Sequence, residues 1–221
     1  MRGIILSAGL GKRLGKITRG IPKPLLPVGG VPIIKLIIKK LKRAGIDKIG
    51  INLYYKADII KERLKGIKGL RIVKEKYLSD TGGALLNFKN FVSADFLIHN
   101  CDIISDVDLK RIIRVHKKIR PGATIVLVKN FKTDRVRILN NRIIKFYKKR
   151  MENCYTYSGI AVLSKRIFNY FPKSKKIFAL TEVYNNAIKD GELLYPVVVN
   201  NTWCDIGTLE NYRKWKDQKL S

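Results

Sequence analysis

The sequence predicts one α/β domain whose central sheet is mainly parallel and carries helices on both faces. Short apolar runs alternate with helical patterns as far as residue 128. This alternation is typical of parallel strands that are joined by helices. The length of 221 residues is sufficient for one sizeable hydrophobic core.

The first half of the chain contains the repeated strand and helix patterns. Buried strands are expected at residues 3–8, 48–53, 70–74, 96–99 and 123–128. Helices are expected at residues 33–44, 57–65, 81–91 and 108–119. Because ligands of such sheets bind beyond the carboxyl ends of the strands, we expect the functional site at that edge.

The second half has shorter, alternating segments, which predict antiparallel or mixed additions to the sheet. Strands are expected at residues 135–139, 142–146, 155–163, 193–199 and 202–204. Helices are expected at residues 165–171, 180–190 and 209–218. The pairs Asn140-Asn141 and Asn200-Asn201 are expected to form turns.

The charge of the chain is strongly positive, with 46 Lys and Arg residues against 17 Asp and Glu residues. Such a charge attracts nucleic acids, anionic membranes and acidic metabolites alike. The lysines are spread over many expected elements, and in the expected helix 33–44 they lie opposite the apolar stripe. We therefore expect a lysine-rich solvated surface and no specific nucleic-acid site. An RNA-binding protein is the alternative that the charge alone supports.

Location and redox state follow from other parts of the sequence. No stretch approaches the roughly 18 apolar residues of a membrane span, and Met1 leads directly into an expected strand. The three cysteines, Cys101, Cys154 and Cys204, lack metal-ligand spacing, and their odd number argues against a disulfide framework. We expect a cytoplasmic protein with reduced thiols and no membrane span.

A glycine-containing loop, Gly9-Leu10-Gly11-Lys12-Arg13-Leu14, follows the first expected strand, and Pro22-Lys23-Pro24 comes soon after. Glycines let backbone N–H groups approach an anion, and Arg13 and Lys23 add positive charge. The glycines alone would also fit an ordinary turn, but the whole set predicts a phosphate site for a nucleoside triphosphate. It is not a Walker A loop, which needs Ser or Thr after the lysine, nor a dinucleotide fingerprint, which needs Gly or Ala where Leu14 stands.

These residues resemble the N-terminal signature of the sugar-1-phosphate nucleotidylyltransferases, also called NDP-sugar pyrophosphorylases. The matching residues are Gly9, Gly11, Arg13, Leu14, Thr18, Pro22, Lys23, Pro24 and Leu25. Lys16 and Ile17 stand where the family often has proline and leucine. Similar segments continue to Asp205-Ile206-Gly207-Thr208, so the resemblance covers nearly the whole chain. It is nearest to small single-domain members such as N-acetylmuramate-1-phosphate uridylyltransferases and mannose-1-phosphate guanylyltransferases.

The resemblance implies a Rossmann-like sheet of the nucleotide-diphospho-sugar transferase type. It also implies a Mg²⁺-dependent reaction in which a nucleoside triphosphate and a sugar-1-phosphate give an NDP-sugar and pyrophosphate. Residues 1–221 would then form a single nucleotidyltransferase domain, without the C-terminal β-helix domain of larger relatives. Nothing in the sequence identifies the base, so the donor stays open among UTP, GTP, dTTP and CTP. The sugar and the oligomeric state are open too.

The resemblance also implies roles for individual residues. Arg13 and Lys23 would be catalytic, because they neutralise phosphate charge. Nucleotide contacts are expected from Leu6, Ala8, Gly9, Gly11, Lys12, Arg13, Thr81, Gly82 and Gly83. Contacts to the sugar phosphate are expected from Lys23, Asn100, Gly159 and Glu182. Asp102 and Asp205 would be the metal ligands, in agreement with the preference of Mg²⁺ for carboxylate oxygens.

Several neighbouring residues have simpler expected roles. Cys101 stands where the family usually has glycine, which would be unfavourable if that position needs a positive φ. Asp80 or Thr81 could cap the helix that follows, and Asp106 and Asp108 fit a capping role. His99 is expected to be packed within its strand, and His116 to be exposed in a lysine-rich helix.

Two further functions share parts of this pattern. A cytidylyltransferase for phosphocholine or inositol phosphate would carry much of the same signature. A non-catalytic protein that binds a nucleotide sugar would also do so, but such proteins tend to lose the lysine or the metal carboxylates. Lys23, Asp102 and Asp205 are all present here, so we expect an active enzyme.

Overall fold

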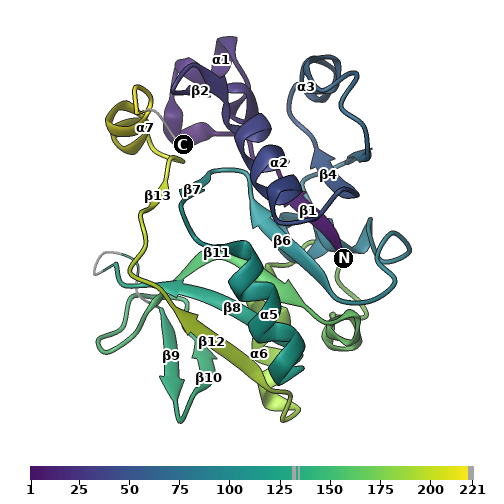
Figure 1. Ribbon diagram of the computed structural model, residues 1–221, viewed down its shortest axis with the longest axis vertical. Helices are drawn as coiled ribbons and strands as arrows, with labels where there is room; N and C mark the ends of the chain where they lie inside the picture. Colours follow the sequence, from purple (N-terminus) through teal and green to yellow (C-terminus); the bar gives the residue numbers. More distant parts are fainter. Residues whose placement is uncertain (131–132, 134, 219–221) are drawn as a thin grey trace.

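The computed structural model describes residues 1–130, 133 and 135–218, and its central feature is a seven-stranded sheet (Figure 1). The strand order is β12-β8-β11-β6-β1-β4-β5. Their bounds are β1 Arg2–Leu6, β4 Ile49–Leu53, β5 Leu70–Lys74, β6 Phe96–Asn100, β8 Ala123–Val128, β11 Thr156–Leu163 and β12 Leu194–Val198. Strand β11 is antiparallel to β6 and β8, and the other pairings are parallel. The expected mainly parallel, mixed sheet is confirmed.

Helices cover both faces of this sheet, as the sequence predicts. One face packs against α2 (Ile33–Arg43), α3 (Ala57–Arg63) and α5 (Leu109–Ile119), and α7 (Leu209–Trp215) adds Tyr212 to the same core from beside the loop after β1. The other face packs against α4 (Asp80–Leu86), the 3-10 helix η3 (Lys165–Tyr170) and α6 (Leu180–Lys189). Consecutive strand residues alternate between the two cores, since Ile4 belongs to one and Ile5 to the other. In Figure 1, α2 and α5 cover the near face.

The glycine-containing loop between β1 and α2 consists of short turns. It contains η1 (Lys12–Leu14), α1 (Ile17–Gly20), η2 (Lys23–Leu25), β2 (Pro27–Val28) and β3 (Val31–Pro32). The buried Leu14 and Thr18 hold it against the rest of the molecule. Prolines and glycines prevent a longer helix here, as expected from the sequence.

Besides the short β2–β3 pair, two small antiparallel pairs lie outside the large sheet within the described residues. Strands β9 (Val136–Leu139) and β10 (Arg142–Phe146) form a hairpin whose turn residues, Asn140 and Asn141, have φ values of 47° and 56°. This confirms one expected turn. The other pair joins β7 (Ile103–Ser105) to β13 (Trp203–Asp205), and we call it the β7–β13 ribbon. The sequence did not predict β7, because three residues are too few for a periodic signal.

Two expectations in the first half were wrong in detail. Helix α4 ends at Leu86 rather than residue 91, because Phe88 and Phe91 are packed in tighter turns, with Phe88 N donating to Leu85 O. His116 is buried rather than exposed, and its Nδ1 lies 2.9 Å from Thr124 Oγ1. It follows Leu109 and Ile112 at helical spacing, so it belongs to the apolar stripe of α5.

Other expectations about single residues are confirmed. His99 is fully buried in β6. Asp108 caps α5, since its Oδ1 accepts a hydrogen bond from Arg111 N at 3.1 Å. Cys101, Cys154 and Cys204 are buried and are not joined in a disulfide within the described residues. Among the helices of the described residues, none has both the length and the apolar composition that crossing a membrane requires.

Candidate active site

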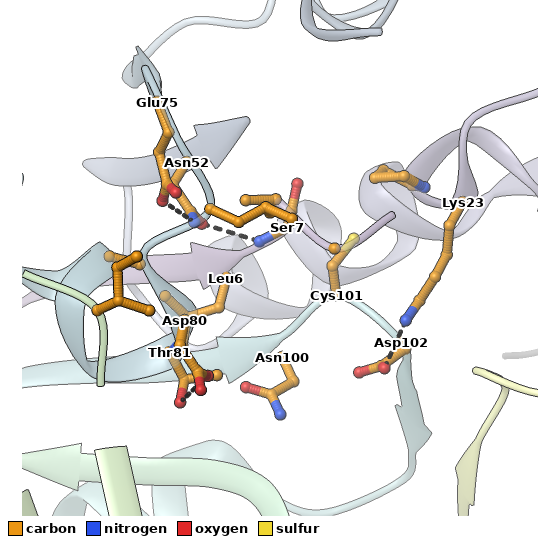
Figure 2. Close-up of a pocket in the computed structure, with 16 residues that line it drawn as sticks. Leu6, Ser7, Lys23, Asn52, Glu75, Asp80, Thr81, Asn100, Cys101 and Asp102 are labelled. Carbon is orange, nitrogen blue, oxygen red and sulfur yellow. Dashed lines mark hydrogen bonds and ion pairs between the residues drawn. The ribbon is translucent and has the colours of Figure 1, made fainter. Parts of the chain in front are cut away.

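Two adjoining cavities lie at the carboxyl ends of β1, β4 and β6. The first cavity has a volume of about 410 Å³ (Figure 2), and the second has a volume of about 1070 Å³. Four residues expected at a nucleotide, Leu6, Ala8, Gly9 and Thr81, line the first cavity, together with Lys23, which was expected at the sugar phosphate. The other residues expected at a sugar phosphate, Asn100, Gly159 and Glu182, line the second, together with Arg13, which was expected at the nucleotide. Asn100 and Asp102 line both cavities and therefore stand at their junction.

The β7–β13 ribbon brings the two expected metal ligands together. Asp102 comes directly before β7, and Asp205 ends β13 opposite Ile103. Ile206 N donates a hydrogen bond of 2.9 Å to the carbonyl oxygen of Asp102. Burial and then the negative charge of Asp102 raise the pKa of Asp205, whereas a hydrogen bond from Gly207 N opposes this rise. The two carboxylates are therefore close enough to influence each other.

Each carboxylate also faces one of the expected catalytic cations. Lys23 Nζ lies 2.6 Å from Asp102 Oδ2, and their side chains are only 13% and 19% exposed. Arg13 Nη2 lies 3.7 Å from Asp205 Oδ2, and the Arg13 side chain is 63% exposed. The more buried pair is the tighter one. The four side chains of alternating charge thus follow the two cavities: Lys23 lines the first, Arg13 and Asp205 line the second, and Asp102 lines both.

This donor set fits Mg²⁺. Magnesium is usually held by one or two carboxylates together with phosphate oxygens and water. Asp102 and Asp205 supply two carboxylates beside a cavity lined by glycine-loop residues. Within the described residues there is no group of three or more His, Cys, Asp or Glu side chains that could hold an ion. The remaining ligands of a metal at this site would be water or phosphate oxygens.

The conformation of the loop depends on Gly11 and Thr18. Gly11 has a φ of +66°, and a Cβ atom there would lie 2.9 Å from Thr18 Cγ2. Thr18 Oγ1 donates to Gly11 O at 3.3 Å and to Gly15 O at 3.1 Å. Gly9 has no atom within 4 Å of such a Cβ, so its open space faces the first cavity. Gly11 and Lys12 line neither cavity, and their contact with a nucleotide stays a prediction.

A buried polar network behind the first cavity was missed by sequence reasoning (Figure 2). Ser7 N donates to Asn52 Oδ1 at 2.8 Å, and Asn52 Nδ2 donates to Glu75 Oε1 at 2.7 Å. Ser79 Oγ donates to Glu75 Oε2 at 2.8 Å. The network connects the end of β1 to the start of α4 and fixes the wall of the cavity. The feature of the sequence that could have revealed this network is the polar residue Asn52 within an apolar strand.

The glycines of α4 have a packing role in the structure. A Cβ atom on Gly82 would lie 2.5 Å from Phe178 Cδ2, and one on Gly83 would lie 2.4 Å from Lys176 O. The N–H groups of both glycines donate to Phe178 O, at 3.0 and 3.1 Å. These amides are therefore used within the protein, and the expected contact of Gly82 and Gly83 with a nucleotide stays a prediction. Thr81 does line the first cavity, and its Oγ1 accepts a hydrogen bond from Leu180 N.

Three residues expected to contact the sugar phosphate, Asn100, Gly159 and Glu182, line the same cavity in the structure. Gly159 has a φ of +82°, and a Cβ there would lie 2.9 Å from Asn100 Nδ2. Glu182 Oε1 lies 2.6 Å from Lys175 Nζ. Cys101 is absent from the residues with positive φ, so its replacement of glycine strains nothing. Burial raises the pKa of its thiol to about 12.

Trp203 is a second residue that sequence reasoning missed. It belongs to β13 and lines the second cavity. Its indole Nε1 donates to Ser158 O at 2.9 Å, which ties the ribbon to β11. A tryptophan directly before Cys204-Asp205 was the signal in the sequence.

A mainly parallel sheet with a glycine-containing loop after β1 and paired carboxylates at the strand ends defines a nucleotide-binding transferase of the α/β class. The family model described as nucleotidyl transferase matches residues 2–221, so the chain belongs to the nucleotidyl transferase family. This confirms the family that the N-terminal signature resembles.

Similar proteins support this placement. The D-glycero-alpha-D-manno-heptose 1-phosphate guanylyltransferase of Campylobacter jejuni is 31% identical, covering 96% of this chain and 97% of that protein. The bifunctional protein GlmU of Methanococcus aeolicus is 33% identical, covering 94% of this chain and 51% of that protein. The chain thus spans about half the length of the GlmU relatives that it matches.

The fold is shared with solved structures as well. A putative glucose-1-phosphate thymidylyltransferase from Bacillus anthracis, solved in complex with a sucrose, superposes with a TM-score of 0.89. The alignment covers 100% of this chain and 97% of that one, at 24% identity. This likeness confirms the nucleotide-diphospho-sugar transferase fold expected from the sequence.

Proposed function

We propose that this chain is a sugar-1-phosphate nucleotidylyltransferase, which converts a nucleoside triphosphate and a sugar-1-phosphate into an NDP-sugar and pyrophosphate. The observation that carries the proposal is the junction of the two cavities at Asn100 and Asp102. A nucleotide in the first cavity and a sugar phosphate in the second would meet there. Lys23 pairs with Asp102 at this junction, and Arg13 and Asp205 line the second cavity.

The reaction needs positioning and charge rather than a protein nucleophile. An ionised oxygen of the sugar phosphate attacks the α-phosphorus, and a new P–O bond forms on that side. The bond from the α-phosphorus to the bridging oxygen breaks on the opposite side, and pyrophosphate leaves with the electron pair. Lys23 and Arg13 place positive charge where the phosphates crowd, and the loop after β1 holds the nucleotide.

The metal proposed here is Mg²⁺, held by Asp102 and Asp205. When bound, it would neutralise phosphate charge and orient the reacting groups. Lys23 would then contact both the carboxylate of Asp102 and the phosphates of the substrates. Its tight pairing with Asp102 in the structure keeps the ammonium at the junction of the cavities.

The substrates are described only by class. The name of the Campylobacter relative includes a guanylyltransferase activity, but the donor of this chain stays open among UTP, GTP, dTTP and CTP. The cytoplasmic location, the single-domain organisation and the absence of a specific nucleic-acid site, all expected from the sequence, stay predictions.

A substrate panel tests the proposal. Each of the four triphosphates is combined with several sugar-1-phosphates, phosphocholine and inositol phosphate, and both pyrophosphate and the nucleotide product are quantified. We expect equal amounts of pyrophosphate and NDP-sugar from at least one sugar-1-phosphate. Turnover only with phosphocholine or inositol phosphate would instead identify a cytidylyltransferase. Tight binding of an NDP-sugar without turnover of any pair would identify a non-catalytic binding protein.

A further inference from the structure

Lys40 of α2 occupies an unusual position for a charged residue. It follows Ile33 and Ile37 at helical spacing and therefore lies on the side of α2 that faces the core. Burial lowers its pKa to about 8, and the negative charge of Asp106 opposes this change only in part. Among the described residues, no carboxylate oxygen lies within 4 Å of its ammonium group. An apolar residue would fit this position with less loss of hydration.

The ammonium group of Lys40 makes two hydrogen bonds to a single residue. Its Nζ donates to Ser105 O at 2.5 Å and to Ser105 Oγ at 2.9 Å. Ser105 is the last residue of β7 and pairs with Trp203 of β13. Lys40 therefore binds one end of the β7–β13 ribbon to α2.

The two carboxylates of the candidate active site lie at the other end of this ribbon. Asp102 precedes β7, and Asp205 ends β13. The ribbon is separate from the seven-stranded sheet. Its position therefore depends on the packing of Ile103, Ile104 and Cys204 in the core and on side-chain hydrogen bonds. Besides Lys40, these include Trp203 Nε1 to Ser158 O at 2.9 Å and Asn211 Nδ2 to Asp205 O at 2.7 Å.

A cavity next to Lys40 makes its hydrogen bonds to the ribbon more important for holding the ribbon against α2. A cavity of about 510 Å³ separates part of α2 from the ribbon and is lined by Leu36, His99, Ile104 and Trp215 among others. Direct apolar packing between α2 and the ribbon is therefore incomplete here. Lys40 bridges the two elements across the edge of this cavity.

We propose that Lys40 is a positioning residue, which holds the β7–β13 ribbon so that Asp102 and Asp205 share one metal ion. It acts through Ser105 and does not touch substrate. The metal part of this inference rests on the proposed function, whereas the tethering part does not. Loss of the tether should increase the local opening of the ribbon and weaken metal binding without unfolding the protein.

The test compares Lys40→Met with Lys39→Met and Lys40→Arg. Methionine retains much of the length of lysine but has no N–H donors, and Lys39 is an exposed neighbour whose loss changes the net charge equally. Amide hydrogen exchange is measured on metal-free protein over residues 103–105 and 203–206. Mn²⁺ affinity is then measured by electron paramagnetic resonance, with no substrate present.

We expect ribbon amides of Lys40→Met to exchange about tenfold faster, because two hydrogen bonds from a charged donor to Ser105 are lost. Mn²⁺ affinity should fall by about tenfold, the lower end of the loss that follows removal of groups hydrogen-bonded to metal ligands, because Lys40 acts on the ligands only through Ser105. Lys39→Met should match the wild type in both measurements, and Lys40→Arg should recover part of the loss. Exchange of the β1 and β6 amides should not change, which separates local opening from a loss of global stability.

Several outcomes decide the matter. Equal ribbon exchange and equal Mn²⁺ affinity in Lys40→Met and Lys39→Met would overturn the proposal. Faster exchange throughout the chain would also overturn it, because the role would then be general stability. If Lys40→Met does not fold, Ser105→Ala, which removes one of the two contacts, is compared with the wild type: faster ribbon exchange would support the proposal, and equal ribbon exchange would overturn it. None of these readouts needs turnover, so failure of the proposed enzyme function would leave the tethering result interpretable.

Discussion

Lys23 and Asp102 form a largely buried ion pair of 2.6 Å at the point where the two cavities meet. The same lysine belongs to the loop after β1, and the same aspartate follows β6. The pair therefore connects the expected phosphate loop directly to the expected metal ligand. The first two predictions follow from this connection.

Replacement of Lys23 by methionine should impair the chemical step more than the stability of the fold. Loss of one charge-assisted contact in a closed site raises the barrier by on the order of 2–4 kcal/mol. Single-turnover rates with saturating substrates measure this step. Lys16→Met, in the same loop and exposed, is the control and should retain activity. A proportional loss of folded protein, with a normal rate per folded molecule, would mean that Lys23 is structural.

Replacement of Asp102 by asparagine should lower kcat by orders of magnitude, because a metal ligand loses its charge while its shape is retained. The thermal unfolding temperature should change little. Asp58→Asn removes an exposed carboxylate of α3 that pairs with Lys74 of β5, and it should leave the rate unchanged. Chelation of divalent cations should abolish turnover of the wild type. Full activity of Asp102→Asn in magnesium would contradict the metal assignment.

Gly82→Ala should destabilise the protein. The added Cβ would lie 2.5 Å from Phe178 Cδ2 and 2.8 Å from Phe178 O, and overpacking of this kind costs about 1–3 kcal/mol. Urea unfolding measures the change, with Gly20→Ala, which has open space around its Cβ position, as the control. A normal unfolding free energy with a raised KM for nucleotide would show that the glycine serves the base instead.

Much of this architecture is readable from the sequence, and the remainder has identifiable physical reasons. The alternating apolar runs predict the sheet, and the spacing of Gly9, Arg13 and Lys23 predicts the phosphate loop. Contacts between distant segments are not encoded in any local pattern. The pairing of β7 with β13 and the approach of Phe178 to Gly82 depend on tertiary packing. The helical spacing of His116 from Leu109 and Ile112 indicates a buried residue, but the lysines around it in the sequence indicate an exposed one.

The stability of the wild type relative to Lys40→Met should rise with pH. Burial lowers the pKa of Lys40 from 10.5 to about 8, and Asp106 opposes this only in part. Between these two values the unfolded chain binds more protons than the folded one, so the unfolding free energy increases with pH. Linkage gives an upper bound on the order of 3 kcal/mol. Urea unfolding of both proteins at pH 7.5, 9.0 and 10.0 measures the difference between their unfolding free energies. If this difference is the same at all three pH values, the lowered pKa of Lys40 is contradicted.

The most direct test of the central claim follows the oxygen atoms of the sugar phosphate. The acceptor is prepared with ¹⁸O in every non-bridging position of its phosphate and is incubated with Mg²⁺ and the preferred unlabelled triphosphate from the substrate panel. If a phosphate oxygen attacks the α-phosphorus, mass spectrometry will find every labelled oxygen in the NDP-sugar and none in pyrophosphate. Loss of a labelled oxygen from the NDP-sugar, or label in pyrophosphate, would contradict the proposed reaction.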